Sequence, residues 1–155
     1  MAHTIKEAFS NLLHTHLHPH STIAIHLHIL SQDGSLLSTL LNASTLALID
    51  AGIPMSDYLT AVTVAAGPST DAPTTSTNAG KDDFDAFLDL NAQEEQELPF
   101  LTIGCVGERV SVLIMETRVR RDRIEAMVGM GIEGCKRVKG ILDGVVKECG
   151  ARMGV

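Results

Sequence analysis

Residues 29–58 constrain the fold most strongly, because they read as turn, helix and helix stop in one unbroken run. Asp33-Gly34 is a dipeptide typical of tight turns. Apolar positions then cover most of a helical surface over residues 35–51, so we expect a helix that is packed on several sides. Gly52 suits the left-handed position after the last turn, and Pro54 prevents the helix from continuing.

Further elements are expected on both sides of this helix. Over residues 22–29, Ile23, Ile25 and Leu27 alternate with polar or small residues, which is the period of a half-buried strand. A helix is predicted upstream, at residues 4–13, and a second strand downstream, at residues 58–66. This mixture of helices and strands indicates an α/β or α+β fold.

Residues 65–83 interrupt the pattern, because they are rich in Pro, Ser, Thr, Gly and Asp and hold few apolar side chains. We expect an inserted, flexible surface loop there. Three strands and a long final helix should follow, at residues 84–90, 98–106, 110–115 and 120–149. Gly131 and Gly134 should let that helix approach the sheet closely.

Composition is consistent with one domain over residues 1–155. The net charge of −7, with histidine neutral, argues against free-standing nucleic-acid binding, which normally shows a basic surface. Cys105, Cys135 and Cys149 are odd in number and lack metal-ligand spacing, so we expect reduced thiols.

Three segments together resemble RNase PH-type domains. They are DGSLLSTLLNASTLALIDAGIPMSDY, FLDLNAQEE and the stretch that begins LPFLTIGCVGERVSVLIM. The resemblance is greatest to the exosome ring lineage that descends from the archaeal phosphorolytic subunit, and it runs from about residue 5 to about residue 150. It implies a mixed sheet with two packed helices, similar to ribosomal protein S5 domain 2.

The resemblance covers only the second half of the family's domain. We therefore expect an N-terminally truncated domain, whether from a truncated gene model, a fragment or a short protein. The strand at residues 22–29 and the helix at 35–51 would then expose apolar faces and unpaired backbone. We expect the chain to be unstable or self-associating until another RNase PH-type subunit, or the missing segment, covers that surface.

The chemistry that the resemblance implies is phosphorolysis, in which phosphate attacks the last 3′ phosphodiester of RNA. Active members place a small hydroxyl residue and an arginine just after the Asp-Gly turn, at positions that are Leu36 and Leu37 here. If the arginine made two charge-assisted bonds of roughly 1.5–3 kcal/mol each, its loss costs about 10²–10⁴ in affinity or rate. The family's other phosphate-binding arginine lies in the missing half, so both arms of the phosphate clamp are absent.

The carboxylates of the family site are better retained. Asp89 stands at the position of the metal-binding aspartate, and Glu95 stands six residues on, where a second acid occurs. In an active enzyme these two would hold Mg²⁺; otherwise the resemblance implies no cofactor. The alternative is that both are solvated acids at the end of a strand.

Two further clusters have possible functions. His26 and His28 share one side of the predicted strand, so a Zn²⁺ or Ni²⁺ site is stereochemically possible there, the alternative being a polar strand face. A basic cluster at the start of the last helix is a candidate RNA contact, the alternative being a solvated helix start with salt bridges to a partner; it consists of Arg118, Arg120, Arg121 and Arg123.

The resemblance thus favours a non-catalytic subunit of the RNA exosome ring. Its implied partners are other RNase PH-type ring subunits, RNA-binding cap proteins, RNA in the channel and a hydrolytic nuclease. Its implied processes are ribosomal RNA maturation and mRNA turnover, in nucleus, nucleolus and cytoplasm. Two alternatives stay open: an active phosphorolytic 3′–5′ exoribonuclease, and a stand-alone metal-binding module built on the histidines.

Overall fold

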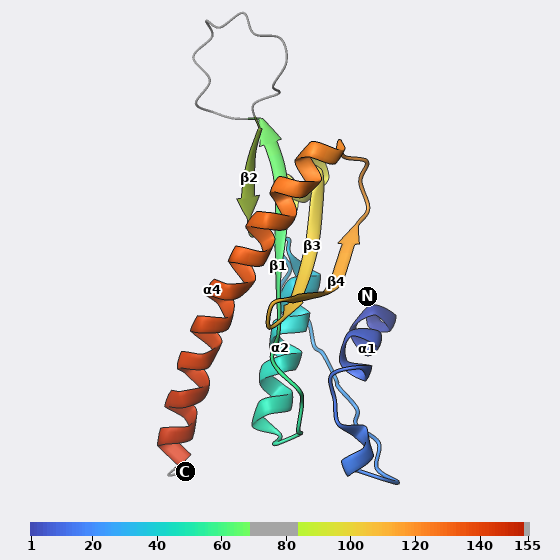
Figure 1. Ribbon diagram of the computed structural model, residues 1–155, viewed down its shortest axis with the longest axis vertical. Coiled ribbons are helices and arrows are strands. Elements are labelled where there is room, and N and C mark those ends of the chain that lie inside the picture. The colour runs from blue at the N-terminus through green and yellow to red at the C-terminus, as the bar shows by residue number, and fades with distance from the viewer. Residues whose placement is uncertain (69–83, 154–155) are drawn as a thin grey trace, which may run out of the picture.

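The computed structural model describes residues 1–68 and 84–153, which form a four-stranded sheet with helices on both faces (Figure 1). The strands pair in the order β2-β1-β3-β4 and are β1 (Leu59–Pro68), β2 (Phe84–Leu88), β3 (Phe100–Val106) and β4 (Arg109–Met115). Each neighbouring pair in this sheet is antiparallel. The α/β class is therefore confirmed, but the described sheet is antiparallel where we expected a mixed one.

Two long helices sandwich the sheet. In Figure 1, α4 crosses in front of the strands and α2 lies behind them. The helical elements are α1 (Ala2–Ser10), the 3₁₀ turn η1 (Thr15–Leu17), α2 (Leu36–Asp50), α3 (Ala92–Glu97) and α4 (Arg121–Met153). Alternation along β1 supplies both interfaces, because Leu59 packs in the cluster that contains Leu41 of α2, whereas Val64 packs with Met127 of α4. The core is therefore split into one layer on each face of the sheet.

Gly131 and Gly134 bring α4 close to the sheet, as predicted. A Cβ atom on Gly131 would lie 2.5 Å from Cγ2 of Ile103, closer than atoms can approach. At Gly134 a Cβ would lie 3.3 Å from side-chain atoms of Leu88 and Val62. The absence of side chains here lets the helix backbone rest on strand side chains.

Several predicted elements are confirmed within a residue or two. Helix α2 starts and ends one residue inside the predicted limits, and Gly52 adopts the expected positive φ of +67°. The β3–β4 hairpin turns at Gly107, also at positive φ. The first helix lies a few residues nearer the N-terminus than expected, and α4 continues to Met153. None of the helices described is long and apolar enough to cross a membrane.

Helix α3 was not predicted. Its sequence, AQEEQE, has no apolar stripe, and periodicity therefore gives no sign of it. The helix starts at a capping box, in which the Asn91 side chain accepts from the backbone of Gln93 and Glu94 while Glu94 accepts from the backbone of Asn91.

The loop predicted at residues 65–83 begins too early. Strand β1 continues to Pro68, and Ala65 and Ala66 are buried in it, so the prediction was wrong for residues 65–68. Small residues fit there because β2 pairs alongside, with Phe87 opposite Ala65. Residues 69–83 lie outside the described part of the chain, so their flexibility stays a prediction.

The strand predicted at residues 22–29 is extended but pairs with no described strand. Its side-chain alternation is as expected: Ile23, Ile25 and Leu27 pack against the core, whereas His26 and His28 are exposed. The sequence pattern determines which side chains face inward, but a ladder also requires a neighbouring strand.

Candidate functional site

The start of α2 is fastened to the connection that follows β2. Gly34, at φ +84°, packs so closely that a Cβ atom would lie 2.3 Å from the Leu90 carbonyl oxygen. Ser35 is buried, and its Oγ donates to the Leu90 carbonyl at 3.1 Å and accepts from the Leu90 amide at 3.0 Å. The Ala92 amide donates to Oδ1 of Asp33 at 3.3 Å. The Asp-Gly turn thus joins two segments that are far apart in sequence.

The carboxylate of Glu95 caps this junction. Its Oε1 accepts a hydrogen bond of 2.7 Å from the backbone amide of Ser35, directly before α2. Amides at a helix start have no partner within the helix and carry partial positive charge, so they favour an anion. Here the anion that one of these amides binds is a side chain of the protein itself.

A pocket of about 170 Å³ lies beside this junction, and its lining carries carboxylates but no lysine or arginine side chain. It is lined by Met1, Thr4, Gln32, Leu36, Leu37, Glu95, Phe100, Thr102, Ile114 and Glu116. Two leucines and two glutamates make poor ligands for phosphate, because leucine donates no hydrogen bond and like charges repel. The structure therefore brings together Leu36, Leu37 and Glu95, three of the predicted site residues, around one small pocket.

Buried hydroxyl groups hold the first turn of α2 to the sheet. Oγ of Ser38 donates to the Ser35 carbonyl oxygen at 2.8 Å and accepts from Oγ1 of Thr63 on β1 at 3.2 Å. Thr63 in turn lies 3.4 Å, oxygen to oxygen, from Thr102 on β3. This network fixes the pocket wall, because each of these buried hydroxyls has a partner.

Asp89 lies outside the pocket lining. It is exposed at the end of β2, adopts φ +62°, and donates its backbone amide to the Thr63 carbonyl at 2.9 Å. Mg²⁺ needs several oxygen ligands. Within the described residues no three His, Cys, Asp or Glu side chains are grouped to hold a metal, and Glu95 already spends one oxygen on Ser35. These side chains do not form a ready Mg²⁺ site, so metal binding by Asp89 and Glu95 stays a prediction.

The other predicted clusters are on the surface. His26 and His28 project from the same exposed side of the extended segment, where their use as metal ligands is untested. The four arginines run from the β4–α4 connection into the first turn of α4. Arg121 lies 3.9 Å from Glu125 in a solvent-exposed pair, which contributes little to stability. RNA contact by Arg118, Arg120, Arg121 and Arg123 likewise stays a prediction.

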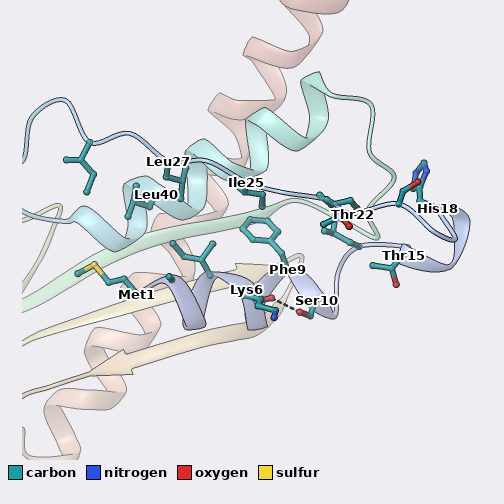
Figure 2. Close-up of a pocket in the computed structure, with 16 residues that line it drawn as sticks. Met1, Lys6, Phe9, Ser10, Thr15, His18, Thr22, Ile25, Leu27 and Leu40 are labelled. Atoms are coloured by element: carbon teal, nitrogen blue, oxygen red, sulfur yellow. Dashed lines mark hydrogen bonds between the residues drawn. The ribbon is translucent and has the colours of Figure 1, made fainter.

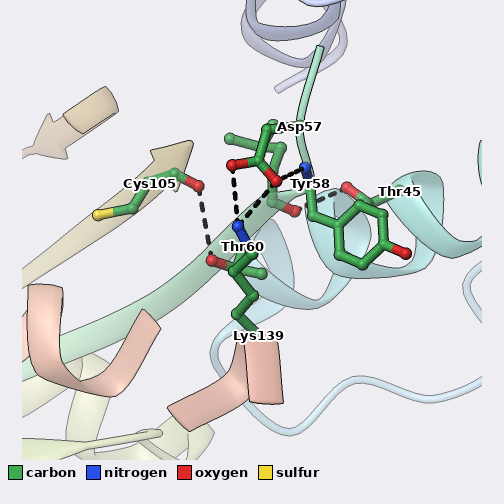
Figure 3. Close-up of polar contacts among 7 residues, drawn as sticks. Thr45, Asp57, Tyr58, Thr60, Cys105 and Lys139 are labelled. Carbon is green, nitrogen blue, oxygen red and sulfur yellow. Dashed lines mark hydrogen bonds and ion pairs between the residues drawn. The ribbon is translucent and has the colours of Figure 1, made fainter. Parts of the chain in front are cut away.

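One polar contact that the sequence analysis missed lies where β1 begins (Figure 3). Lys139 of α4 reaches Asp57, whose Oδ1 also accepts from the Tyr58 amide at 2.7 Å. Burial alone would raise the pKa of Asp57, but the hydrogen bonds from Lys139 and Tyr58 and the lysine charge together lower it. The two partners are 82 positions apart, and no spacing rule would have paired them.

The three cysteines are free thiols, as predicted. Cys105 and Cys135 are buried between β3 and α4, and burial raises the pKa of both, that of Cys135 to about 12. Because the thiolate is the reactive form, these two are poor nucleophiles at neutral pH. Cys149 is exposed.

The comparison with protein families places this geometry in a known class. A sequence profile of the "3′ exoribonuclease family, domain 1", RNase PH, matches residues 1–54. Together with the relatives described next, this match assigns the chain to the RNase PH family.

Its relatives include components of the exosome complex. The chain is 32% identical to exosome complex component ski6 of Schizosaccharomyces pombe over 146 residues, and 36% identical to SKI6 of Saccharomyces cerevisiae over 129 residues. These alignments cover 93% and 82% of this chain but 54% and 46% of the relatives. The chain therefore spans about half the length of these relatives.

A solved structure shows the same fold. The crystal structure of rice Rrp46 superimposes with a TM-score of 0.76, over 93% of this chain and 62% of that one, at 22% sequence identity. At that identity the match bears on the fold alone. The RNase PH-type architecture expected from the sequence is thereby confirmed.

Proposed function

We propose that this chain acts as a non-catalytic, RNase PH-type subunit of an RNA exosome ring. Its ring partners would be other RNase PH-type subunits, and the assembled ring would support RNA-binding cap proteins and pass RNA 3′ ends to a hydrolytic nuclease. We infer roles in ribosomal RNA maturation and mRNA turnover, in nucleus, nucleolus and cytoplasm. The names of the relatives support the exosome assignment.

The pocket at the start of α2 is the observation that carries the non-catalytic part of this proposal. Phosphorolysis requires cations that hold inorganic phosphate against the RNA backbone. The pocket instead has Leu36 and Leu37, two glutamates and no lysine or arginine side chain, and Glu95 already binds the Ser35 amide. A phosphate entering it would meet repulsion rather than a clamp.

An active phosphorolytic exoribonuclease is the competing function, and the retention of Asp89 and Glu95 favours it. In that case both carboxylates would hold Mg²⁺ to neutralise the transferring phosphoryl group. Glu95 would then have to release the Ser35 amide or share its second oxygen with the metal. The proposal therefore assigns Glu95 a structural role, and the cofactor is none.

Co-expression with RNase PH-type exosome subunits tests the assembly part. The tagged 155-residue chain should co-purify with them as one defined species in size-exclusion chromatography with light scattering. If the chain elutes as a monodisperse monomer in their presence, the ring-subunit proposal is wrong. A chain that binds nothing but itself would count against it equally.

A further inference from the structure

A large apolar groove lies between α1 and the extended segment 21–29 (Figure 2). Its volume is about 750 Å³, and Phe9 of α1 lies across it from Ile25 and Leu27, with Leu40 of α2 beside them. Most of the surface that faces the groove is therefore hydrocarbon. An exposed hollow of this kind marks a place where another molecule binds.

The backbone beside this groove has unmet hydrogen-bonding capacity. No amide or carbonyl of residues 22–31 bonds to any residue that the structure describes. Backbone groups in an extended segment normally pair with a neighbouring strand. Because Ile23, Ile25 and Leu27 already fix which face points inward, the segment has the side-chain register of a strand but lacks its neighbour.

We propose that residues 22–29 accept a β-strand from a second RNase PH-type polypeptide. That strand would pair with the exposed main chain and place its alternate apolar side chains in the groove over α1. The proposal rests on the proposed function and specifies the surface that this chain offers to a partner.

Two observations favour a strand as the occupant. A compact apolar ligand could fill the groove, but it would leave the row of main-chain donors and acceptors unpaired, whereas an added strand satisfies both. In addition, the relatives carry about 46% of their length outside the aligned part (100 − 54), so proteins of this family contain further polypeptide that the present chain does not cover.

Amide hydrogen exchange of the whole chain, alone and in the complex with RNase PH-type exosome subunits, tests the proposal. In the isolated chain at low concentration, the amides of residues 22–29 should exchange rapidly, because they have no described partner. In the complex, at least alternate amides of the segment should be slowed 100-fold or more. The amides of β1 serve as the internal reference, since they are paired in both states.

Proline substitution probes the same main chain. His26→Pro and Leu27→Pro each remove one amide, and consecutive amides point to opposite edges, so at least one variant should weaken the complex tenfold or more. His26→Ser is the matched control, because it changes the same exposed side chain and keeps the amide; it should bind like the unaltered chain. A circular-dichroism melt of each variant establishes that it is folded.

The outcomes separate this inference from the proposed function. A complex that forms while residues 22–29 stay unprotected, or that tolerates both prolines, would retain the ring-subunit function and overturn the strand-docking site. Protection that rises with the concentration of the chain alone would identify a second copy as the occupant and contradict the proposal. Failure to form any complex would overturn both.

Discussion

Nζ of Lys139 lies 2.7 Å and 2.8 Å from the two carboxylate oxygens of Asp57, and this contact ties the middle of α4 to the segment that leads into β1. The same lysine lies 6.0 Å from the centre of the Tyr58 ring. Helix α4 is otherwise held by apolar contacts with the sheet, so this ion pair is a directional contact that helps to set its position along the strands.

The ion pair should make stability depend on pH in the acid range. The pKa of Asp57 is lowered in the folded chain, so its contribution is complete above the unfolded value of about 3.8 and disappears as the pH falls through the lower folded value. Both side chains are about one-third exposed, 31% and 37%, which limits the effect to about 0.5–1 kcal/mol. Asp57→Asn should lose this amount in urea unfolding at pH 7 and differ less from the unaltered chain at pH 3. An equal loss at both pH values would contradict the assignment.

Adding one methyl group to α4 should have opposite effects at two glycines. Gly131→Ala forces a Cβ against buried Ile103 and should destabilise the chain by roughly 1–3 kcal/mol. Gly140→Ala places the methyl in open space, so the helix gains roughly 0.5–1 kcal/mol from reduced backbone entropy. Denaturant midpoints of the two variants provide the measurement. Stabilisation by both would mean that α4 does not pack on β3 as described.

Neutralising Glu95 should loosen the start of α2. Glu95→Gln removes the negative charge from the bond to the Ser35 amide and should cost about 1 kcal/mol of folding free energy. Glu97→Gln is the control, because Glu97 is exposed in the same short helix, and its change should stay within about 0.5 kcal/mol. Chemical denaturation at neutral pH measures both, and equal effects would show that the Glu95 contact contributes nothing specific.

The thiols should differ in reactivity. In the folded chain a disulfide reagent should modify exposed Cys149 promptly at pH 8, while Cys105 and Cys135 react only after unfolding. Because the pKa of Cys135 is raised, folding stability should fall as the pH rises above the value of a free thiol, about 8.5–9. Cys135→Ala should reduce that alkaline loss. Prompt reaction of all three thiols would contradict the buried positions.

Local pattern predicted the elements well where one period dominated. Helix α2 could be bounded from its apolar surface, the Asp33-Gly34 turn and Gly52, and the β3–β4 hairpin from its two apolar runs. Helix α3 was missed because a capping box, rather than an apolar stripe, begins it. Residues 22–29 have a correct side-chain pattern, yet pairing is a property of two segments, so sequence alone overpredicted a strand there.

The site was only partly predictable for a similar reason. The resemblance identified Leu36, Leu37 and Glu95, which the fold gathers at one pocket. It gave no indication that Glu95 would bind the Ser35 amide 60 positions earlier, or that Glu116 would share the pocket. Such contacts depend on how α2 and α3 dock on the sheet, which no local spacing encodes.

The most direct test of the central claim is a phosphorolysis assay on the chain in its purified complex with RNase PH-type subunits. A 3′-tailed RNA is incubated with inorganic phosphate and Mg²⁺, and released nucleoside diphosphates are quantified for the unaltered chain and for Asp89→Asn. Because Leu36 and Leu37 replace the phosphate clamp, we predict that the two complexes release the same amount, whether none or that of another subunit. Phosphate-dependent release that Asp89→Asn abolishes would show that this chain is itself the phosphorolytic enzyme.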